Sequence, residues 1–179
     1  MRVIPTAIPE VRVIEPAVFK DERGFFMETY HEKRYREMGI AVAFVQDNLA
    51  FSVKGTLRGL HYQHPNAQAK LVQAIQGEIF DVAVDIRRDS ATFGKWVGEI
   101  LSGTNKKQFF IPAGFAHGYC VMSDTALVTY KCSTAYSPGD EKGVLWSDPD
   151  LKIEWPIKDP LVSEKDKNLP KLRSAKISR

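Results

Sequence analysis

The sequence predicts an all-β protein, a jelly-roll β-sandwich or barrel with a few short peripheral helices. Apolar and polar residues alternate at every second position, most regularly from Phe80 to Ile86, which is the period of a β-strand. Turn residues separate the strand-like stretches at short intervals, and no helical stretch is long enough to organise the fold. Many short strands with few helices favour a sandwich or barrel, and the interior of a jelly roll suits a small ligand.

The first half of the chain offers strand candidates on both sides of one short helix. Residues 11–14, 25–30 and 42–52 have strand-like composition. The stretch from His31 to Met38 has the best helical pattern, and Gly39 follows it as a stop signal. We expect this helix to lie at the periphery.

The middle of the chain predicts a β-hairpin. Residues 70–75 and 80–86 are joined through Gln76-Gly77, where glycine supplies a positive φ angle. In the second strand the even positions are apolar, whereas Asp81, Ala83 and Asp85 fall on the other face. We therefore expect an antiparallel pair whose second strand is half-buried. The remaining strand candidates are residues 96–101, 108–111, 126–134 and 143–145, and Ser163 is a candidate cap for a second helical turn.

Length and composition are those of one globular domain spanning residues 1–179. No apolar stretch approaches the length of a membrane span, and the N-terminus lacks a secretory signal pattern, so we expect a cytoplasmic protein that does not bind membranes. Cys120 and Cys132 are expected to be free buried thiols. The net charge of +3 comes largely from the tail after Ser163, and no basic stripe on a recognised module suggests nucleic-acid binding.

Histidine residues, which are rare in this chain, are concentrated in two glycine-containing segments. The chain has 4 His, of which His61 and His117 lie in the runs 57–63 and 111–118, with Arg58 and Lys70 close by in sequence. Imidazole groups suit acid–base chemistry near neutral pH, and cationic side chains suit a negatively charged substrate. These segments predict an acid–base reaction on an anionic ligand.

Ordered sequence blocks cover nearly the whole chain. They are residues 21–28, 46–48, 57–63, 67–70, 81–87, 111–118, 130–131, 136–138, 146–149 and 161–166. In this order the blocks closely resemble the dTDP-4-dehydrorhamnose 3,5-epimerases, which are cupin-like jelly rolls. Ser147 stands where the family more often has Asn, a departure that touches no chemical role. The resemblance implies an isomerase of dTDP-L-rhamnose biosynthesis, and hence of cell-surface polysaccharide formation, with dTDP-4-dehydro-6-deoxy-D-glucose as substrate.

The resemblance also implies four catalytic residues. The C4 ketone of the substrate acidifies the protons on C3 and C5, so each inversion needs a base and an acid on opposite faces of the ring. By resemblance His61 is the base, Asp166 is its carboxylate partner, Tyr130 donates the proton and Lys70 stabilises the enolate oxygen. Residue type alone would favour structural or exposed polar roles for all of them.

The carboxylate partner of His61 stays open when only residue types are considered. Asp166 lies in a charged C-terminal segment, where solvated aspartates are common. Asp81 or Asp85 could pair with His61 instead.

Further residues would bind the nucleotide diphosphate and the sugar. Guanidinium groups present a planar fork to phosphate oxygens, so Arg23 and Arg58 are candidate pyrophosphate or sugar contacts. By resemblance Phe26 stacks on thymine. The other implied contacts are Glu28, Gln46 and Asn48 for the nucleoside or pyrophosphate, Ser52 and His117 for the sugar pocket, and Tyr136 as a cover.

In the family the N-terminal strands exchange between two subunits. The resemblance therefore implies a homodimer in which Arg23, Phe26 and Glu28 serve the neighbour's site. No metal or other cofactor is expected, because the His-x-His pattern of metal-binding cupins is missing from the sequence. His61 and His64 are three residues apart, so in an extended strand they face opposite sides of the sheet.

Two other classes of function fit the same fold. One is a relative that inverts a single centre or moves the ketone between C3 and C4 in another dTDP-deoxysugar pathway. The other is a non-catalytic jelly roll that binds sugar nucleotides, because a fold alone does not establish a function. Tyr130 favours inversion at C5, and the set of His61, Lys70, Tyr130 and Asp166 argues against a silent binder.

Overall fold

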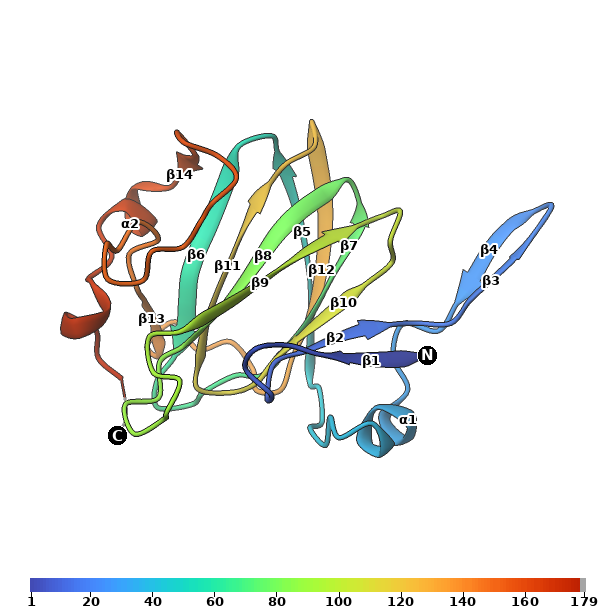
Figure 1. Cartoon of the computed structure of the whole chain (residues 1–179), viewed down its shortest axis with the longest axis horizontal. Helices are drawn as coiled ribbons and strands as arrows, with labels where there is room; N and C mark the ends of the chain where they lie inside the picture. Colours follow the sequence, from blue (N-terminus) through green and yellow to red (C-terminus); the bar gives the residue numbers. More distant parts are fainter. Residues whose placement is uncertain (178–179) are drawn as a thin grey trace.

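The computed structural model describes residues 1–177 and contains mainly β-strands, with a few short helices (Figure 1). The predicted all-β class is confirmed. The helical elements are α1 (Glu32–Glu37), α2 (Glu164–Lys167) and η1 (Leu172–Ser174). The strands are β1 (Arg2–Pro5), β2 (Arg12–Glu15), β3 (Val18–Asp21), β4 (Gly24–Met27), β5 (Gln46–Val53), β6 (Thr56–Gln63), β7 (Lys70–Gln76), β8 (Glu78–Asp85), β9 (Trp96–Ser102), β10 (Gln108–Ile111), β11 (Phe115–Val121), β12 (Thr125–Cys132), β13 (Glu141–Gly143) and β14 (Leu161–Val162).

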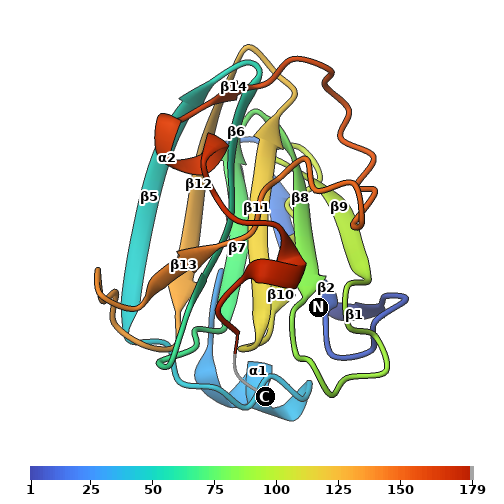
Figure 2. The same cartoon turned by 90° about the vertical axis from the view of Figure 1, so that its left-hand side faces the viewer.

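Two large sheets face each other as a jelly-roll sandwich (Figures 1 and 2). The first sheet has the order β1-β2-β10-β7-β12-β5, and the second has the order β13-β6-β11-β8-β9, with β14 added parallel to β6. From β5 to β12 the chain crosses repeatedly between the two sheets, which is the double Greek-key winding of a jelly roll. Within residues 1–177, no helix has the length and apolar character needed to cross a membrane.

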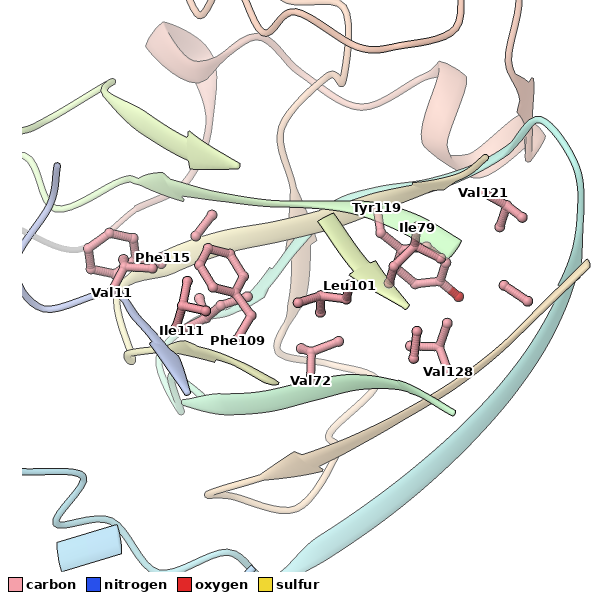
Figure 3. Close-up of a cluster of buried hydrophobic side chains, with 14 of the residues drawn as sticks. Val11, Val72, Ile79, Leu101, Phe109, Ile111, Phe115, Tyr119, Val121 and Val128 are labelled. Atoms are coloured by element: carbon pink, nitrogen blue, oxygen red, sulfur yellow. The ribbon is translucent and has the colours of Figure 1, made fainter. Parts of the chain in front are cut away.

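An apolar core fills part of the space between the sheets. Phe109 and Val72 of the first sheet meet Leu101 and Ile79 of the second, and all four are fully buried (Figure 3). Burial of a side chain of this size stabilises the folded state by roughly 1.5–3 kcal/mol. This core holds the sheets at a fixed separation, and the remaining interior is available for polar residues.

The outer face of the second sheet is covered by the C-terminal part of the chain. Val82 and Val84 of β8 pack there against Leu151, Leu172 and Ala175. The expectation of a half-buried β8 is therefore wrong, because its apolar face is covered from outside while its other face lies between the sheets. The polar side chains of β8 consequently point inward.

The predicted hairpin of residues 70–86 is also wrong. β7 pairs with β10 and β12, whereas β8 pairs with β9 and β11, so the two strands belong to different sheets. Gly77 has the expected positive φ of 77°, and a Cβ there would lie 2.0 Å from the carbonyl oxygen of Thr125. Glycine is thus needed for a tight crossing between sheets. Local turn chemistry predicts the bend and cannot distinguish a crossing from a hairpin.

Both predicted helical segments are confirmed. α1 is followed by Gly39, whose φ of 82° ends the helix, and its buried Tyr35 packs beneath the first sheet. Ser163 caps α2 by accepting a hydrogen bond from the backbone N–H of Asp166 at 3.1 Å. The cap fixes Asp166 in the first turn of this short helix.

The sequence prediction missed the strands β1, β3, β6, β11 and β14. Of these, β6 and β11 form part of the site, and both contain glycine, a residue depleted in strands. β6 and β11 pair antiparallel, with His117 opposite His61 and Tyr119 opposite Arg58. Between these pairs Gly118 alone faces Gly59 and the residue after it, which is the two-against-one arrangement of a β-bulge.

The bulge requires both glycines. A Cβ on Gly118 would lie 2.7 Å from the carbonyl oxygen of Arg58, and a Cβ on Gly59 would lie 2.6 Å from the Cα of Gly118. The extra residue in β6 allows Arg58 and His61, three positions apart, to point to the same side. Without it, the alternation of an extended strand would separate them.

We expect Gly118→Ala to lower the free energy of unfolding by about 1–3 kcal/mol, because the backbones of β6 and β11 must move apart. Urea denaturation measures this change. Gly139→Ala is the matched control, since a Cβ there meets nothing within 4 Å. A Gly118→Ala variant as stable as the wild type would show that the close approach is not required.

Candidate active site

A cavity of about 710 Å³ opens between the two sheets. β6 contributes Arg58 and His61, β11 contributes His117, and Lys70 and Tyr130 come from the opposite sheet. A second cavity of about 290 Å³ shares His61, Lys70 and Tyr130 with the first. Because they share these residues, the two cavities form one site with two compartments. We call the larger cavity the deep compartment and the smaller cavity the outer compartment.

His61 and Asp166 form a close pair in the wall of the deep compartment. The distance between Nε2 of His61 and Oδ1 of Asp166 is 2.6 Å. The other oxygen of Asp166 accepts the backbone N–H of Gly59 at 3.2 Å. Burial is the largest single influence and would raise the pKa of Asp166, but the hydrogen bonds from His61 and Gly59 and the charges of His61 and Lys165 together lower it. Asp166 is thus a carboxylate at neutral pH, which keeps a proton on Nε2 and leaves Nδ1 of His61 free.

The other two candidate carboxylates have different partners. Asp81 lies 2.9 Å from Nε2 of His117, and both residues are buried. Burial raises the pKa of Asp81 and lowers the pKa of His117, so burial favours the uncharged form of each. Asp85 accepts hydrogen bonds from a cationic side chain and two hydroxyl groups. These donors belong to Arg87, Ser90 and Thr92.

Lys70 and Tyr130 face the two histidines from the first sheet. The ammonium group of Lys70 lies 5.9 Å from the centre of the Tyr130 ring. Burial lowers the pKa of Lys70, although the nearby Cys132, Asp81 and Glu141 oppose this effect. Burial raises the pKa of Tyr130, so its phenol stays protonated at neutral pH. The cavity therefore holds a free imidazole nitrogen, an ammonium group and a phenol.

The outer compartment contains the predicted residues Gln46, Asn48 and Tyr136. It also contains Glu141, which the sequence analysis did not identify. Glu141 accepts the hydroxyl of Tyr136 at 2.8 Å and the ammonium of Lys165 at 2.6 Å. Glu141 and Lys165 lie in charged stretches of the sequence that look solvated. Only their contact across 24 residues reveals them as a pair at the site.

Ser52 and the residues of the N-terminal strands lie outside the cavity wall. Ser52 is buried behind Arg58, whose Nε donates to its hydroxyl at 3.1 Å. Within residues 1–177, the lining of both compartments includes none of Arg23, Phe26 and Glu28. Arg23 and Phe26 lie on the hairpin of β3 and β4, which projects away from the sandwich, and Glu28 follows it and pairs with Arg34 (Figure 1).

In the part of the chain that the structure describes, no three His, Cys, Asp or Glu side chains come together in a way that could hold a metal ion. His61 and His117 each have a carboxylate partner instead.

Fold and site together define a class: a cupin-like jelly roll whose cavity is equipped for acid–base chemistry. A family model described as dTDP-4-dehydrorhamnose 3,5-epimerase matches residues 5–174. The chain belongs to this family of isomerases.

Individual relatives agree with this assignment. A dTDP-4-dehydrorhamnose 3,5-epimerase from Shigella flexneri is 58% identical over 170 residues, covering 94% of each chain. The crystal structure of a 3,5-epimerase from Legionella pneumophila in complex with dTDP-4-keto-L-rhamnose has a TM-score of 0.94, with 51% identity over 97% of this chain and 93% of that chain. A dTDP-4-dehydrorhamnose 3-epimerase from Streptomyces niveus is 39% identical over 98% of this chain and 86% of its own length.

The hydrogen bonds to Asp85 make its contribution to stability dependent on pH. Burial would raise its pKa, but the donors of Arg87, Ser90 and Thr92 lower it from 3.8 to about 2. A lowered pKa stabilises the folded state above pH ~4, and this contribution of roughly 2 kcal/mol is lost as the pH falls through about 2. We expect the difference in free energy of unfolding between wild type and Asp85→Asn to shrink by about 1 kcal/mol between pH 6 and pH 3.

Urea denaturation at each pH measures this difference. The exposed neighbour Asp89 offers a control, because Asp89→Asn should leave the unfolding free energy nearly unchanged at both pH values. A constant difference for Asp85→Asn across this range would contradict the proposed origin of its stabilisation.

Proposed function

We propose that the chain catalyses epimerisation at C3 and C5 of dTDP-4-dehydro-6-deoxy-D-glucose to dTDP-4-dehydro-L-rhamnose, a step of dTDP-L-rhamnose biosynthesis. The observation that carries this proposal is the meeting of the His61–Asp166 pair, Lys70 and Tyr130 around one cavity. Family membership supports the same reaction. No metal or other cofactor is needed, because each step has a protein group to perform it.

Proton abstraction is assigned to His61. Its Nε2 is held by the Asp166 carboxylate, so Nδ1 is the nitrogen that would accept a proton from C3 or C5. The imidazolium formed in this step is stabilised by the ionised Asp166. Asp166 also fixes the direction of the imidazole ring, since its second oxygen is anchored to the backbone of Gly59.

Stabilisation of the enolate oxygen at C4 is assigned to Lys70. Removal of either proton places negative charge on this oxygen, and an enclosed ammonium group stabilises it more strongly than solvent would. Lys70 reaches the cavity from β7, in the sheet opposite His61. The sugar ring would therefore lie between the two sheets.

Reprotonation is assigned to Tyr130. Its raised pKa keeps the phenol protonated at neutral pH, as a general acid requires. His61 lies on β6 and Tyr130 on β12, so the base and the acid approach from opposite sheets. A sugar held between them presents one face to each residue, which is the arrangement that inversion of a centre demands.

The first experiment is incubation with dTDP-4-dehydro-6-deoxyglucose in heavy water, with a chelator present, followed by NMR and mass spectrometry. Deuterium at both C3 and C5, with formation of the L-sugar, is the expected result. Deuterium at one carbon only would assign the chain to single-centre enzymes such as the 3-epimerase relative. No deuterium at either carbon would indicate a non-catalytic protein that binds sugar nucleotides. Activity that is lost with the chelator and restored by one added metal ion would contradict metal independence.

The His61→Asn variant tests the base directly. We expect a loss of turnover of roughly 10²- to 10⁴-fold with unchanged circular dichroism, because the variant keeps a polar side chain but cannot accept the proton. His31→Asn is the matched control, since His31 is exposed in front of α1. Normal turnover by folded His61→Asn would exclude His61 as the base.

We also propose a homodimer in which the β3–β4 hairpin serves the partner's site. The hairpin projects from the sandwich, and 71% of Phe26 is exposed (Figure 1). β5 supports an interface too, because it exposes Leu49, Phe51 and Val53 at alternate positions of an edge strand. Exposed apolar patches of this kind mark contact surfaces. In such a dimer Arg23 and Phe26 would complete the outer compartment of the neighbouring subunit.

Subunit complementation tests the exchange. Arg23→Ala and His61→Asn are each expected to have low activity alone. In a mixed dimer, one site would combine an intact His61 with an intact Arg23 from the partner. Random pairing of co-expressed subunits should then restore about a quarter of wild-type activity. No recovery, with light scattering showing mixed dimers, would mean that each hairpin serves its own subunit.

We propose a cytoplasmic location as well. Cys120 and Cys132 are both free thiols, which suits a reducing compartment.

A further inference from the structure

One buried polar atom has no role in the chemistry described so far. Tyr119 is 3% exposed, and within residues 1–177 its hydroxyl is the buried side-chain polar atom without a hydrogen-bond partner. A hydroxyl buried in this way costs roughly 1–3 kcal/mol when its hydrogen bond is not made. Buried polar groups are nearly always paired, so this hydroxyl requires an explanation.

The position of Tyr119 connects the hydroxyl to the deep compartment. Its side chain lines that compartment, and its ring centre lies 6.2 Å from that of His117. The ring itself packs in the apolar core with Val121 and Val128. Figure 3 shows the ring between the sheets, with its oxygen directed away from Leu101 and Phe109. Packing therefore fixes the ring, and the hydroxyl is the one polar group of this side chain.

The neighbours of the hydroxyl are polar. Arg58 lies opposite Tyr119 on β6, and its Nε donates to the Ser52 hydroxyl at 3.1 Å. Burial raises the pKa of Tyr119, with Ser52 and Arg58 opposing the effect, so the phenol remains a donor at neutral pH. Arg58 and Tyr119 therefore form a polar part of the wall of the compartment that His61 and His117 also line, and Ser52 lies behind Arg58.

We propose that the Tyr119 hydroxyl donates a hydrogen bond to a hydroxyl oxygen of the sugar ring and thereby makes Tyr119 a specificity-determining residue. This inference rests on the proposed function, because it takes the sugar of the nucleotide substrate as the occupant. The sugar is favoured over the nucleotide because Tyr119 lies beside the histidines. The polar residues assigned to the nucleotide, Gln46 and Asn48, line the outer compartment instead.

The test uses Tyr119→Phe, which removes one oxygen and keeps the ring in the core. We expect KM for dTDP-4-dehydro-6-deoxyglucose to rise about three- to tenfold, with kcat changed less than twofold, as loss of one neutral hydrogen bond implies. The affinity for dTDP alone, measured by calorimetry, should stay at the wild-type value. The melting temperature of the free enzyme should not fall, because no bond within the protein is lost.

Tyr35→Phe is the matched control. Tyr35 is equally buried, but its hydroxyl donates to the side chain of Gln108 at 2.6 Å beneath the first sheet. This variant should lose thermal stability and keep the wild-type KM. The pair of variants thus separates a hydroxyl that serves the fold from one that serves the substrate.

Several outcomes would overturn the inference. A wild-type KM for Tyr119→Phe would mean that the hydroxyl meets no substrate atom. Equal weakening of dTDP and of the full substrate would place the contact on the nucleotide. If wild type itself produces no L-sugar, the proposed function fails and the inference fails with it. If the wild type is active and Tyr119→Phe has the same KM and kcat, the inference about Tyr119 is wrong and the proposed function still stands.

Discussion

The close approach of β6 and β11 at Gly59 and Gly118 is the constraint on which the rest of the site depends. The bulge puts Arg58 and His61 on the inner side of one strand and frees the backbone N–H of Gly59. Asp166 accepts that N–H and also holds His61, so one carboxylate stabilises the distorted backbone and orients the imidazole ring. A side chain on either glycine would separate the strands and displace His61 and Asp166. Gly59 and Gly118, which look like loop residues in the sequence, are therefore structural parts of the two strands that carry His61 and His117.

A second constraint is the unusual use of both faces of the second sheet. The apolar residues of β8 are covered from outside by the C-terminal segment, which leaves the inner face free to carry Asp81. The same segment delivers α2, and with it Asp166, to the wall of the cavity. Covering the outer face and supplying the carboxylate are thus coupled tasks of one segment. An interior polar enough for catalysis is tolerated because burial outside the sandwich stabilises the sheet.

The sequence predicts the architecture better than it predicts the connections. Alternation at 80–86 identifies a strand, but it cannot show that an external segment covers Val82 and Val84, so the burial of β8 was misjudged. Gly77 indicates a bend between β7 and β8. Only the long-range pairing decides which strands β7 and β8 join. Within the site, His61, Lys70 and Tyr130 were identified by resemblance and do meet at one cavity. The residue types alone could not show which of the three aspartates pairs with His61, or that Glu141 belongs to the site. Both depend on contacts between residues far apart in the chain.

The electrostatics of the cavity favour the charge that the reaction creates. Lys70 is partly buried in the cavity wall, and burial lowers its pKa, so an ammonium group there carries a desolvation penalty. Neutral substrate atoms near C4 relieve little of this penalty. An enolate oxygen beside the ammonium supplies the missing counter-charge, so their attraction is stronger in the transition state than in the ground state. A lysine in water would gain much less, because solvent would already stabilise it. In the proposed reaction the jelly roll would contribute by limiting the contact of Lys70 with water, while His61 and Tyr130 act from opposite sheets.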